Sequence, residues 1–269
     1  MTGSLPEPDF SRLGPQPGFR LAVTGGCGGI GRRLVEVALA QGLRVADIDL
    51  PQSLERHGPP PEAAAIPYDA RSEDETGAAF EALGKHWDGE LDGLVHLPGY
   101  MTSDRHIDEL SMEEIDDILN VNLRSSFLAA RASLPLFRKA GGGAMVFAAS
   151  GLATLVEKNT AAYSASKAGV IALAKGLAKE NAPDIRANVI APGAVDTAFL
   201  RGGTGRGGDE SNAKDMLAEL GHGQIMATIP LGRIAVVDDI VGPILFLLGD
   251  KSRFMTGQTM HINGGRQMI

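Results

Sequence analysis

The order in which strand-like and helix-like segments follow one another predicts an α/β fold for this chain. From Phe19 onward, short apolar runs typical of buried strands alternate with longer segments whose apolar residues recur at helical spacing. A glycine-rich turn separates the first strand-like run from the first helix-like segment. These observations predict a single-domain, doubly wound and mostly parallel sheet with helices on both faces.

Local patterns and boundary residues place each element. Phe19 to Val23 is the first expected strand, the helix after the glycine-rich turn stops at Gly42, and Leu43 to Ile48 is the second strand. Later strands are expected at 64–67, 91–97, 144–149, 185–191 and 258–262. Further helices are expected at 72–86, 111–120, 123–139, 161–181 and 237–248. We find no internal repeat and no second domain.

Two segments depart from this alternation. Residues 1–18 hold four prolines among glycines, and we expect them to form a flexible leader before the catalytic domain at 19–269. The stretch 196–228 has no clear periodicity and is rich in glycine. Long loops inside compact domains are usually functional or disordered, so we expect a mobile substrate lid there.

Composition restricts the possible partners. The 269 residues are 43% hydrophobic, enough for a large core, and the net charge of −8 argues against nucleic acid or an anionic membrane as a partner. No apolar run approaches the roughly 20 residues needed to span a bilayer. The single cysteine, Cys27, suits the reducing cytoplasm and lacks the neighbouring cysteines or histidines of a zinc site. We therefore expect a cytoplasmic protein without a metal.

The run Thr24-Gly25-Gly26-Cys27-Gly28-Gly29-Ile30-Gly31 predicts a dinucleotide-binding turn. Glycines let main-chain N–H groups approach a diphosphate, and the following helix points its partly positive N-terminus at the same anion. Because a strand precedes the run and a helix follows it, the context is that of a Rossmann-type unit. The expected cofactor contacts in this run are Gly25, Gly29, Ile30 and Gly31.

Asp49 predicts which dinucleotide is bound. It closes the second strand 18 residues past Gly31, near the roughly 20-residue offset at which such units place an acid on the adenosine ribose. Its carboxylate can accept hydrogen bonds from the ribose hydroxyls but repels a 2′-phosphate, and the neighbours Leu50 and Pro51 carry no positive charge. NAD is therefore favoured over NADP. Asp47, on the same strand face, is the second candidate for this role.

Ser150, Tyr163 and Lys167 are the candidate catalytic residues. Tyr163 and Lys167 are four residues apart near the start of a helix, so both project from one face, where the ammonium can stabilise a phenolate. This would lower the tyrosine pKa from its ordinary value of about 10 toward the working pH, as a general acid/base requires. Ser150 ends the preceding strand, where its hydroxyl can bind a substrate oxygen.

In these motifs the chain resembles the short-chain dehydrogenase/reductase family, from about Phe19 to Gly265. The family's Thr-Gly-x-x-x-Gly-x-Gly pattern matches Thr24 to Gly31, and its Tyr-x-x-x-Lys pattern matches Tyr163 to Lys167. The family's serine, thirteen residues before the tyrosine, matches Ser150. The segment from Thr256 to Gly265 resembles the family's C-terminal strand signature.

The resemblance implies further site residues. Asn122, in the segment Asn120 to Leu123, would hold a relay water, and Asp69 would contact the adenine amino group. The other cofactor contacts that it implies are Ala70, Gly99, Tyr163, Lys167, Pro192, Gly193, Val195 and Thr197.

The chain departs from the family at His96-Leu97-Pro98-Gly99, where Asn-Asn-Ala-Gly is usual. Because Pro98 lacks an N–H group and fixes φ, we expect the cofactor contact there to differ. His96 is expected to be a hydrogen-bonded structural residue rather than a catalytic addition.

The implied activity is interconversion of a secondary alcohol and a ketone by hydride transfer with NAD, with Tyr163 as the acid/base and no metal. Two alternatives stay open: an NADPH-linked ketone or ketoacyl reductase, and a catalytically silent protein that senses NAD. The helices at 123–139 and 161–181 carry apolar residues for a partner, so we expect a homotetramer or homodimer, as similar family members form.

A small-molecule alcohol or ketone is the expected substrate. Its pocket is expected to be mostly apolar, which favours a ring or chain alcohol over a sugar with many hydroxyls. The residues expected to line this pocket are Leu152, Asn159, Ala194, Phe199 and Met226.

Overall fold

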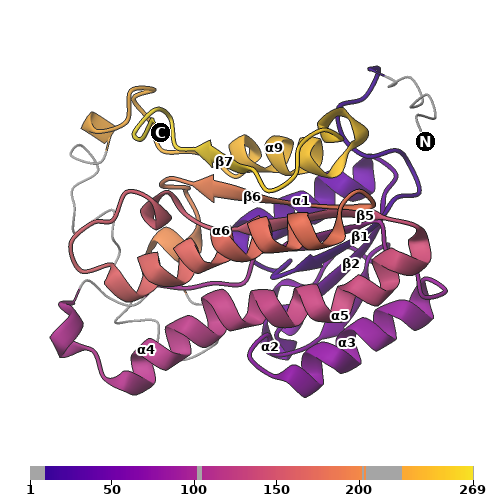
Figure 1. Cartoon of the computed structure of the whole chain (residues 1–269), viewed down its shortest axis with the longest axis horizontal. Coiled ribbons are helices and arrows are strands. Elements are labelled where there is room, and N and C mark those ends of the chain that lie inside the picture. The colour runs from indigo at the N-terminus through magenta and orange to yellow at the C-terminus, as the bar shows by residue number, and fades with distance from the viewer. Residues whose placement is uncertain (1–9, 102–104, 202, 204–225, 269) are drawn as a thin grey trace.

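A wholly parallel sheet of seven strands forms the centre of the computed structural model (Figure 1), which describes residues 10–101, 105–201, 203 and 226–268. The strand order is β3-β2-β1-β4-β5-β6-β7. Every pairing is parallel, which confirms the predicted fold class. The strands are β1 (Arg20–Thr24), β2 (Arg44–Asp49), β3 (Ala64–Pro67), β4 (Gly93–His96), β5 (Gly143–Ala148), β6 (Ile185–Pro192) and β7 (Thr259–Ile262).

The strand order reverses at β1, because β2 and β3 lie on one side of it and β4 on the other. In open α/β sheets, the carboxyl ends of the strands at such a reversal form a crevice where ligands bind. The fold therefore places the functional site at the ends of β1, β4 and β5.

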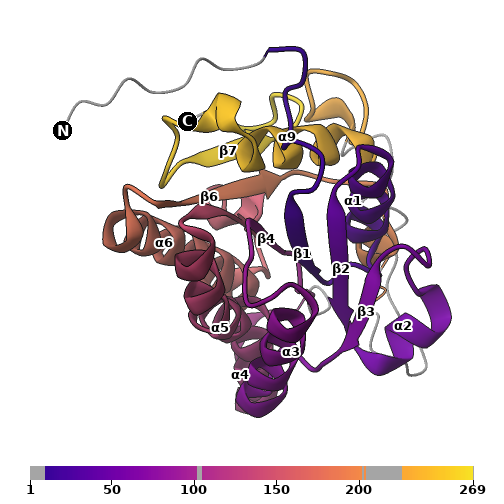
Figure 2. The same ribbon diagram turned by 90° about the vertical axis from the view of Figure 1, so that its right-hand side faces the viewer.

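Helices cover both faces of the sheet, as Figure 2 shows in a view along it. On one face lie α1 (Gly29–Ala40) and α9 (Asp238–Leu248), and on the other lie α3 (Glu73–His86), α5 (Ser125–Ala140) and α6 (Ala161–Asn181). Alternate residues of β1 serve the two cores, since Leu21 and Val23 join one buried cluster and Ala22 joins the other. Both cores are thus built from the period-two pattern of the strands.

The helices α4 (Met112–Leu119) and α5 are joined by a π-helical turn, Asn120–Arg124. The sequence predicts two separate helices here. Ser111 begins α4 with a capping box, in which its hydroxyl accepts from Glu114 N and the Glu114 carboxylate accepts from Ser111 N. The wider turn after α4 carries Asn122, and such turns are often found at functional sites.

A short helix, α2 (Pro51–His57), follows β2 directly, where the sequence analysis expects no helix. The segment begins with Pro51 and contains no long apolar stripe, so its pattern resembles a turn. Proline at the first helical position instead supplies a suitable φ and lacks only an N–H group that would have no helical partner. This helix lies at the carboxyl end of β2, next to Asp49.

The described part of the expected leader, residues 10–18, lies against the domain. The guanidinium of Arg12 donates to the carbonyl of Gln41 at 2.7 Å, and Gly18 N donates to the carbonyl of Gly42 at 2.8 Å. These two hydrogen bonds hold residues 12 and 18 to the C-terminal end of α1, and the expectation of a flexible leader over residues 1–18 stays a prediction. These two hydrogen bonds could not be predicted from the prolines of the segment, because the accepting carbonyls belong to Gln41 and Gly42 at the C-terminal end of α1.

Most of the expected lid, residues 204–225 of 196–228, lies outside the described residues, so the lid stays a prediction. Its first part forms a 3-10 turn at Ala198–Arg201. Among the described residues, none of the helices combines the length and apolar character needed to cross a bilayer.

Candidate active site

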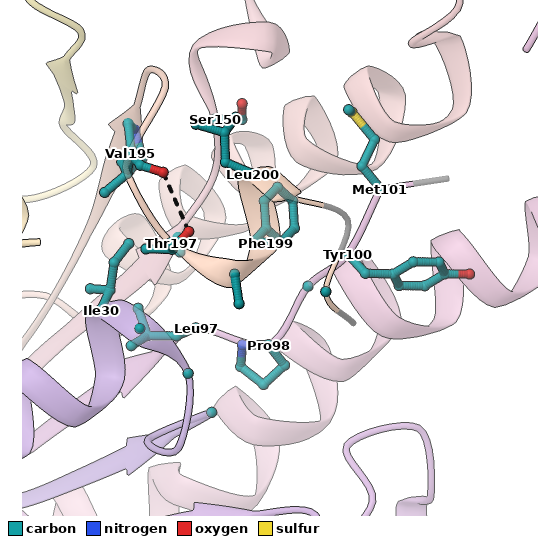
Figure 3. A pocket seen from close by; sticks show the side chains of 18 of the residues that line it. Ile30, Leu97, Pro98, Tyr100, Met101, Ser150, Val195, Thr197, Phe199 and Leu200 are labelled. Atoms are coloured by element: carbon teal, nitrogen blue, oxygen red, sulfur yellow. Dashed lines mark hydrogen bonds between the residues drawn. The ribbon is translucent and has the colours of Figure 1, made fainter. Parts of the chain in front are cut away.

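A cavity of about 970 Å³ lies at the carboxyl ends of the strands (Figure 3). In this view Ile30, Leu97 and Pro98 lie near the start of α1, and Tyr100 and Met101 lie on the other side. Every residue that the sequence predicts as a cofactor contact lines this cavity: Gly25, Gly29, Ile30, Gly31, Asp49, Asp69, Ala70, Gly99, Tyr163, Lys167, Pro192, Gly193, Val195 and Thr197.

The glycine-rich turn has no room for side chains. A Cβ on Gly31 would overlap the Gly25 carbonyl oxygen, and one on Gly29 would lie 2.7 Å from Thr197 Cγ2. Gly28, the N-cap of α1, supplies no side-chain acceptor, and the first turn of α1 contains no acidic residue. The N-terminus of α1 is therefore available to an anion, and the turn fits a dinucleotide diphosphate.

The Asp49 carboxylate lines the cavity at the end of β2. Its Oδ2 accepts from Cys27 N at 2.9 Å and its Oδ1 accepts from Leu50 N at 2.7 Å. Burial raises the pKa of Asp49, and these backbone hydrogen bonds oppose the shift. The two bonds fix the carboxylate at the position where the sequence predicts the adenosine ribose.

Asp47, the second candidate, is 1% exposed and does not line the cavity. It lies beneath the turn, where a Cβ on Gly26 would overlap its carboxylate. Burial and the nearby charge of Asp49 raise the pKa of Asp47 to about 7. The fold also brings Cys27 within 4.8 Å of both carboxylates, but burial and these charges raise the pKa of the thiol and so oppose the thiolate that a metal requires.

Basic side chains that sequence reasoning missed line the same cavity. They are Arg56 and His57 from α2, and Arg32 from α1. A fourth basic residue, Arg71, also lines the cavity, and its Nη2 lies 2.6 Å from Asp69 Oδ2. The immediate neighbours of Asp49 carry no positive charge, but the unpredicted helix α2 brings such charge to the cavity wall.

Ser150 and Tyr163 meet at the inner end of the cavity. Ser150 is 9% exposed, and its Oγ accepts from Leu152 N at 3.1 Å. Burial raises the pKa of Tyr163 to about 12, and a hydrogen bond with Ser150 opposes the shift. The fold thus joins a serine at the end of β5 to a tyrosine on α6, as the sequence predicts.

Lys167 is buried one turn of α6 beyond Tyr163. Its Nζ donates to the Ala148 carbonyl at 3.0 Å and lies 5.9 Å from the centre of the Tyr163 ring. Burial lowers the pKa of Lys167 to about 8. Burial of the phenol and its hydrogen bond with Ser150 shift the Tyr163 pKa in opposite directions, and the Lys167 ammonium donates to a carbonyl. The expectation that Lys167 lowers the Tyr163 pKa stays a prediction.

Asn122 lies behind the cavity wall and is 0% exposed. Its side chain accepts from Tyr100 N and donates to Tyr100 O, each at 2.9 Å, and also donates to Ser166 Oγ at 3.1 Å. A Cβ on Gly99 would lie 2.8 Å from Lys167 Nζ and 3.1 Å from Asn122 Oδ1. Gly99 therefore lets the backbone pass close to both side chains, and the relay role of Asn122 stays a prediction.

His96 is a hydrogen-bonded structural residue, as expected. It is 2% exposed, with Nδ1 2.8 Å from Thr24 Oγ1 and Nε2 2.9 Å from Ser125 Oγ. The Ser125 hydroxyl donates to the Val121 carbonyl at 2.5 Å, so its oxygen accepts from His96 Nε2–H. Burial, with the charge of Lys167, lowers the pKa of His96 to about 3. A neutral imidazole thus ties the end of β1 to the π turn that carries Asn122.

The substrate end of the cavity also has polar residues that the sequence analysis does not name. Leu152, Asn159, Ala194 and Phe199 line it as expected, whereas Met226 does not. Five further polar residues also line the cavity: Glu157, Lys158, Asn263, Arg266 and Gln267. These side chains reach the cavity because the end of the chain folds back against the loop after Ser150. The expectation of a mostly apolar substrate pocket stays a prediction.

Comparison with known proteins agrees with this geometry. The family model described as "Enoyl-(Acyl carrier protein) reductase" matches residues 25–267. A probable galactose dehydrogenase, GalD, of Rhizobium meliloti (strain 1021) is 36% identical over 274 residues, covering 97% of this chain and 99% of the relative.

Two solved structures share the fold over nearly the whole chain. The ligand-free aldohexose dehydrogenase of Thermoplasma acidophilum has a TM-score of 0.82 and 26% identity, over 93% of this chain and 94% of that one. A 3-ketoacyl-(acyl-carrier-protein) reductase from Brucella melitensis, complexed with NADH, has a TM-score of 0.82 and 26% identity, over 94% and 99%.

Replacement of His96 by glutamine should reduce the acid sensitivity of the fold. The native His96 pKa is about 3, against about 6.5 when unfolded, so below pH 6.5 the unfolded state binds a proton that the native state does not. This contribution to stability is complete above pH 6.5 and is lost progressively toward pH 3. From pH 7 to 5, His96→Gln should lose about 2 kcal/mol less unfolding free energy than the wild type.

Urea denaturation at both pH values measures this difference, and the other titrating groups cancel in the comparison. Equal losses in the two proteins would contradict a buried, neutral His96.

Proposed function

This chain belongs to the short-chain dehydrogenase/reductase family, and we propose that it is an NAD-dependent dehydrogenase that oxidises a secondary carbinol to a carbonyl group. The observation that carries this proposal is one continuous cavity whose lining includes Asp49 at the end of β2, Ser150 just after β5 and Tyr163 on α6. The glycine-rich turn lines the same cavity. A dinucleotide placed along it brings a redox group to the acid/base pair.

The side chains define the proton chemistry. When bound, NAD supplies the acceptor for the carbinol hydride. The Ser150 hydroxyl donates a hydrogen bond to the substrate oxygen, and Tyr163 Oη removes the O–H proton as the carbonyl forms. Because burial raises the Tyr163 pKa to about 12, its phenolate needs a nearby cation, and Lys167 on the same helix face is the candidate.

Support for NAD comes from the fixed carboxylate of Asp49, whose charge opposes a 2′-phosphate. The basic residues of α1 and α2 in the lining favour the second candidate, an NADPH-linked ketone or ketoacyl reductase. We rank NAD first because Asp49 is held in place by two hydrogen bonds, whereas Arg56 and His57 are exposed. A catalytically silent NAD sensor is disfavoured by the retained Ser150–Tyr163 contact.

Tyr163→Phe should abolish turnover and leave the NAD dissociation constant within a few-fold. The substitution removes only the hydroxyl that takes the substrate proton, and the ring remains against Phe199. Lys167→Ala should impair both turnover and NAD binding, because its ammonium lines the cavity and also lies near the phenol of Tyr163. Steady-state assays with a panel of alcohols and fluorescence titration with NAD measure the two effects. Substantial activity in the phenylalanine variant would refute the assigned acid/base.

NAD should exceed NADP in kcat/KM by about a hundredfold, and Asp49→Ser should erode this ratio. The carboxylate that accepts ribose hydroxyls is replaced by a neutral group that tolerates a phosphate. Arg56→Ala is the matched control: it should lower the residual use of NADP and leave NAD nearly unchanged. Equal use of both cofactors by the wild type would favour the reductase alternative instead.

We also propose a homo-oligomer, a tetramer or dimer, that pairs through α5 and α6, the helices expected from the sequence. On these helices Leu128, Phe137 and Leu177 are buried within the chain itself, so they cannot contact a partner. Phe127 on α5 is 52% exposed.

Phe127→Asp should therefore shift the molar mass measured by light scattering toward the monomer, because it places a charge in an apolar contact. A wild-type protein that is monomeric at micromolar concentration would exclude the assembly.

A further inference from the structure

Asn159 carries a buried acceptor that has no hydrogen-bond partner. It lies between Ser150 and the first residue of α6, and it lines the cavity. Its Oδ1 is buried, and no donor among the described residues reaches it. Buried polar atoms are almost always paired, and an unpaired one lowers stability, so this oxygen calls for an explanation.

Backbone conformation explains only part of the choice of asparagine. Thr160 N donates to the Glu157 carbonyl at 3.3 Å, and Thr160 Oγ1 donates to the same carbonyl at 2.8 Å, which closes a four-residue turn. Asn159, the third residue of this turn, has a φ of +63°. Glycine suits that conformation best and asparagine next. Glycine would satisfy the turn without burying an unpaired oxygen, so the amide has a second role.

Two neighbouring polar groups of the substrate end already have partners. Arg266 Nη2 is paired with Glu157 Oε1 at 3.0 Å, and the side-chain amide of Gln267 is hydrogen-bonded to Thr154 Oγ1 at 2.6 Å. These contacts tie the end of the chain to the loop after Ser150, and they close one side of the cavity. Asn159 differs from these two groups because its Oδ1 has no hydrogen-bond partner among the described residues.

We propose that Asn159 Oδ1 accepts a hydrogen bond from a second hydroxyl of the substrate, vicinal to the carbinol held by Ser150 and Tyr163. The substrate class is then a vicinal diol, as in a sugar or cyclitol, rather than a simple secondary alcohol. This inference rests on the proposed dehydrogenase function. A site built to pair with a hydroxyl discriminates strongly against the analogue that lacks it, because the protein group then stays unpaired.

Cyclohexanol and the cis and trans 1,2-cyclohexanediols form a test set that differs by one hydroxyl. With saturating NAD, the wild type should favour one diol over cyclohexanol in kcat/KM by about tenfold or more. Asn159→Gly keeps the turn and removes the amide, so the ratio of kcat/KM for the diol to that for cyclohexanol should fall close to one. Asn159→Asp keeps an acceptor and should retain the preference for the diol.

A diol preference that survives in Asn159→Gly, or a wild type that prefers cyclohexanol, would overturn the inference. Thermal unfolding of each variant separates loss of the amide from loss of the fold, and Asn159→Gly should melt at or above the wild-type temperature.

Absence of turnover with every alcohol and both cofactors would refute the proposed function, and binding then decides the role of Asn159. Ligand-observed NMR in the presence of NAD measures the dissociation constants of the diols and cyclohexanol. Tighter diol binding that is lost in Asn159→Gly supports the inference, and equal binding of diol and cyclohexanol contradicts it.

Discussion

Close approach of the backbone at positions without a Cβ is the constraint on which this site depends. Gly31 packs on the carbonyl of Gly25, a Cβ on Gly25 would lie 3.1 Å from Pro98 N, and Gly99 passes beside Lys167 and Asn122. These contacts bring together the ends of β1 and β4 at the reversal of strand order. A side chain at any of these positions would separate the glycine-rich turn from the helix that carries the acid/base residues.

Burial is the second determinant, because it sets the protonation of the side chains that surround the cavity. Tyr163 and Lys167 shift in the directions that favour their neutral forms, to pKa values of about 12 and 8. His96 is kept neutral by the same cause, and it connects Thr24 to Ser125 below the π turn. An imidazole thus makes the side-chain hydrogen bonds at the end of β4, where the family usually has an asparagine.

Sequence reasoning predicted cofactor-end and acid/base residues that the fold brings to one cavity, because their pattern is contained in short segments. The glycine run, Asp49 and the spacing of Tyr163 and Lys167 are each set by one strand–helix unit or one helix turn. It did not predict α2 or the further polar residues of the substrate end. The helix α2 has little apolar periodicity, and Arg266 reaches Glu157 from 109 residues away in the chain.

By itself, the sequence determined the parallel sheet and predicted the dinucleotide turn and the tyrosine–lysine pair, since hydrophobic period and local spacing are properties of contiguous residues. Only the tertiary structure decided which acid faces the cavity. Asp47 is buried beneath the glycine-rich turn, whereas Asp49 lines the cavity. The tertiary structure also decided which polar side chains reach the substrate end and that Asn159 has an unpaired oxygen. Those properties depend on which distant segments pack together, and no local pattern records that.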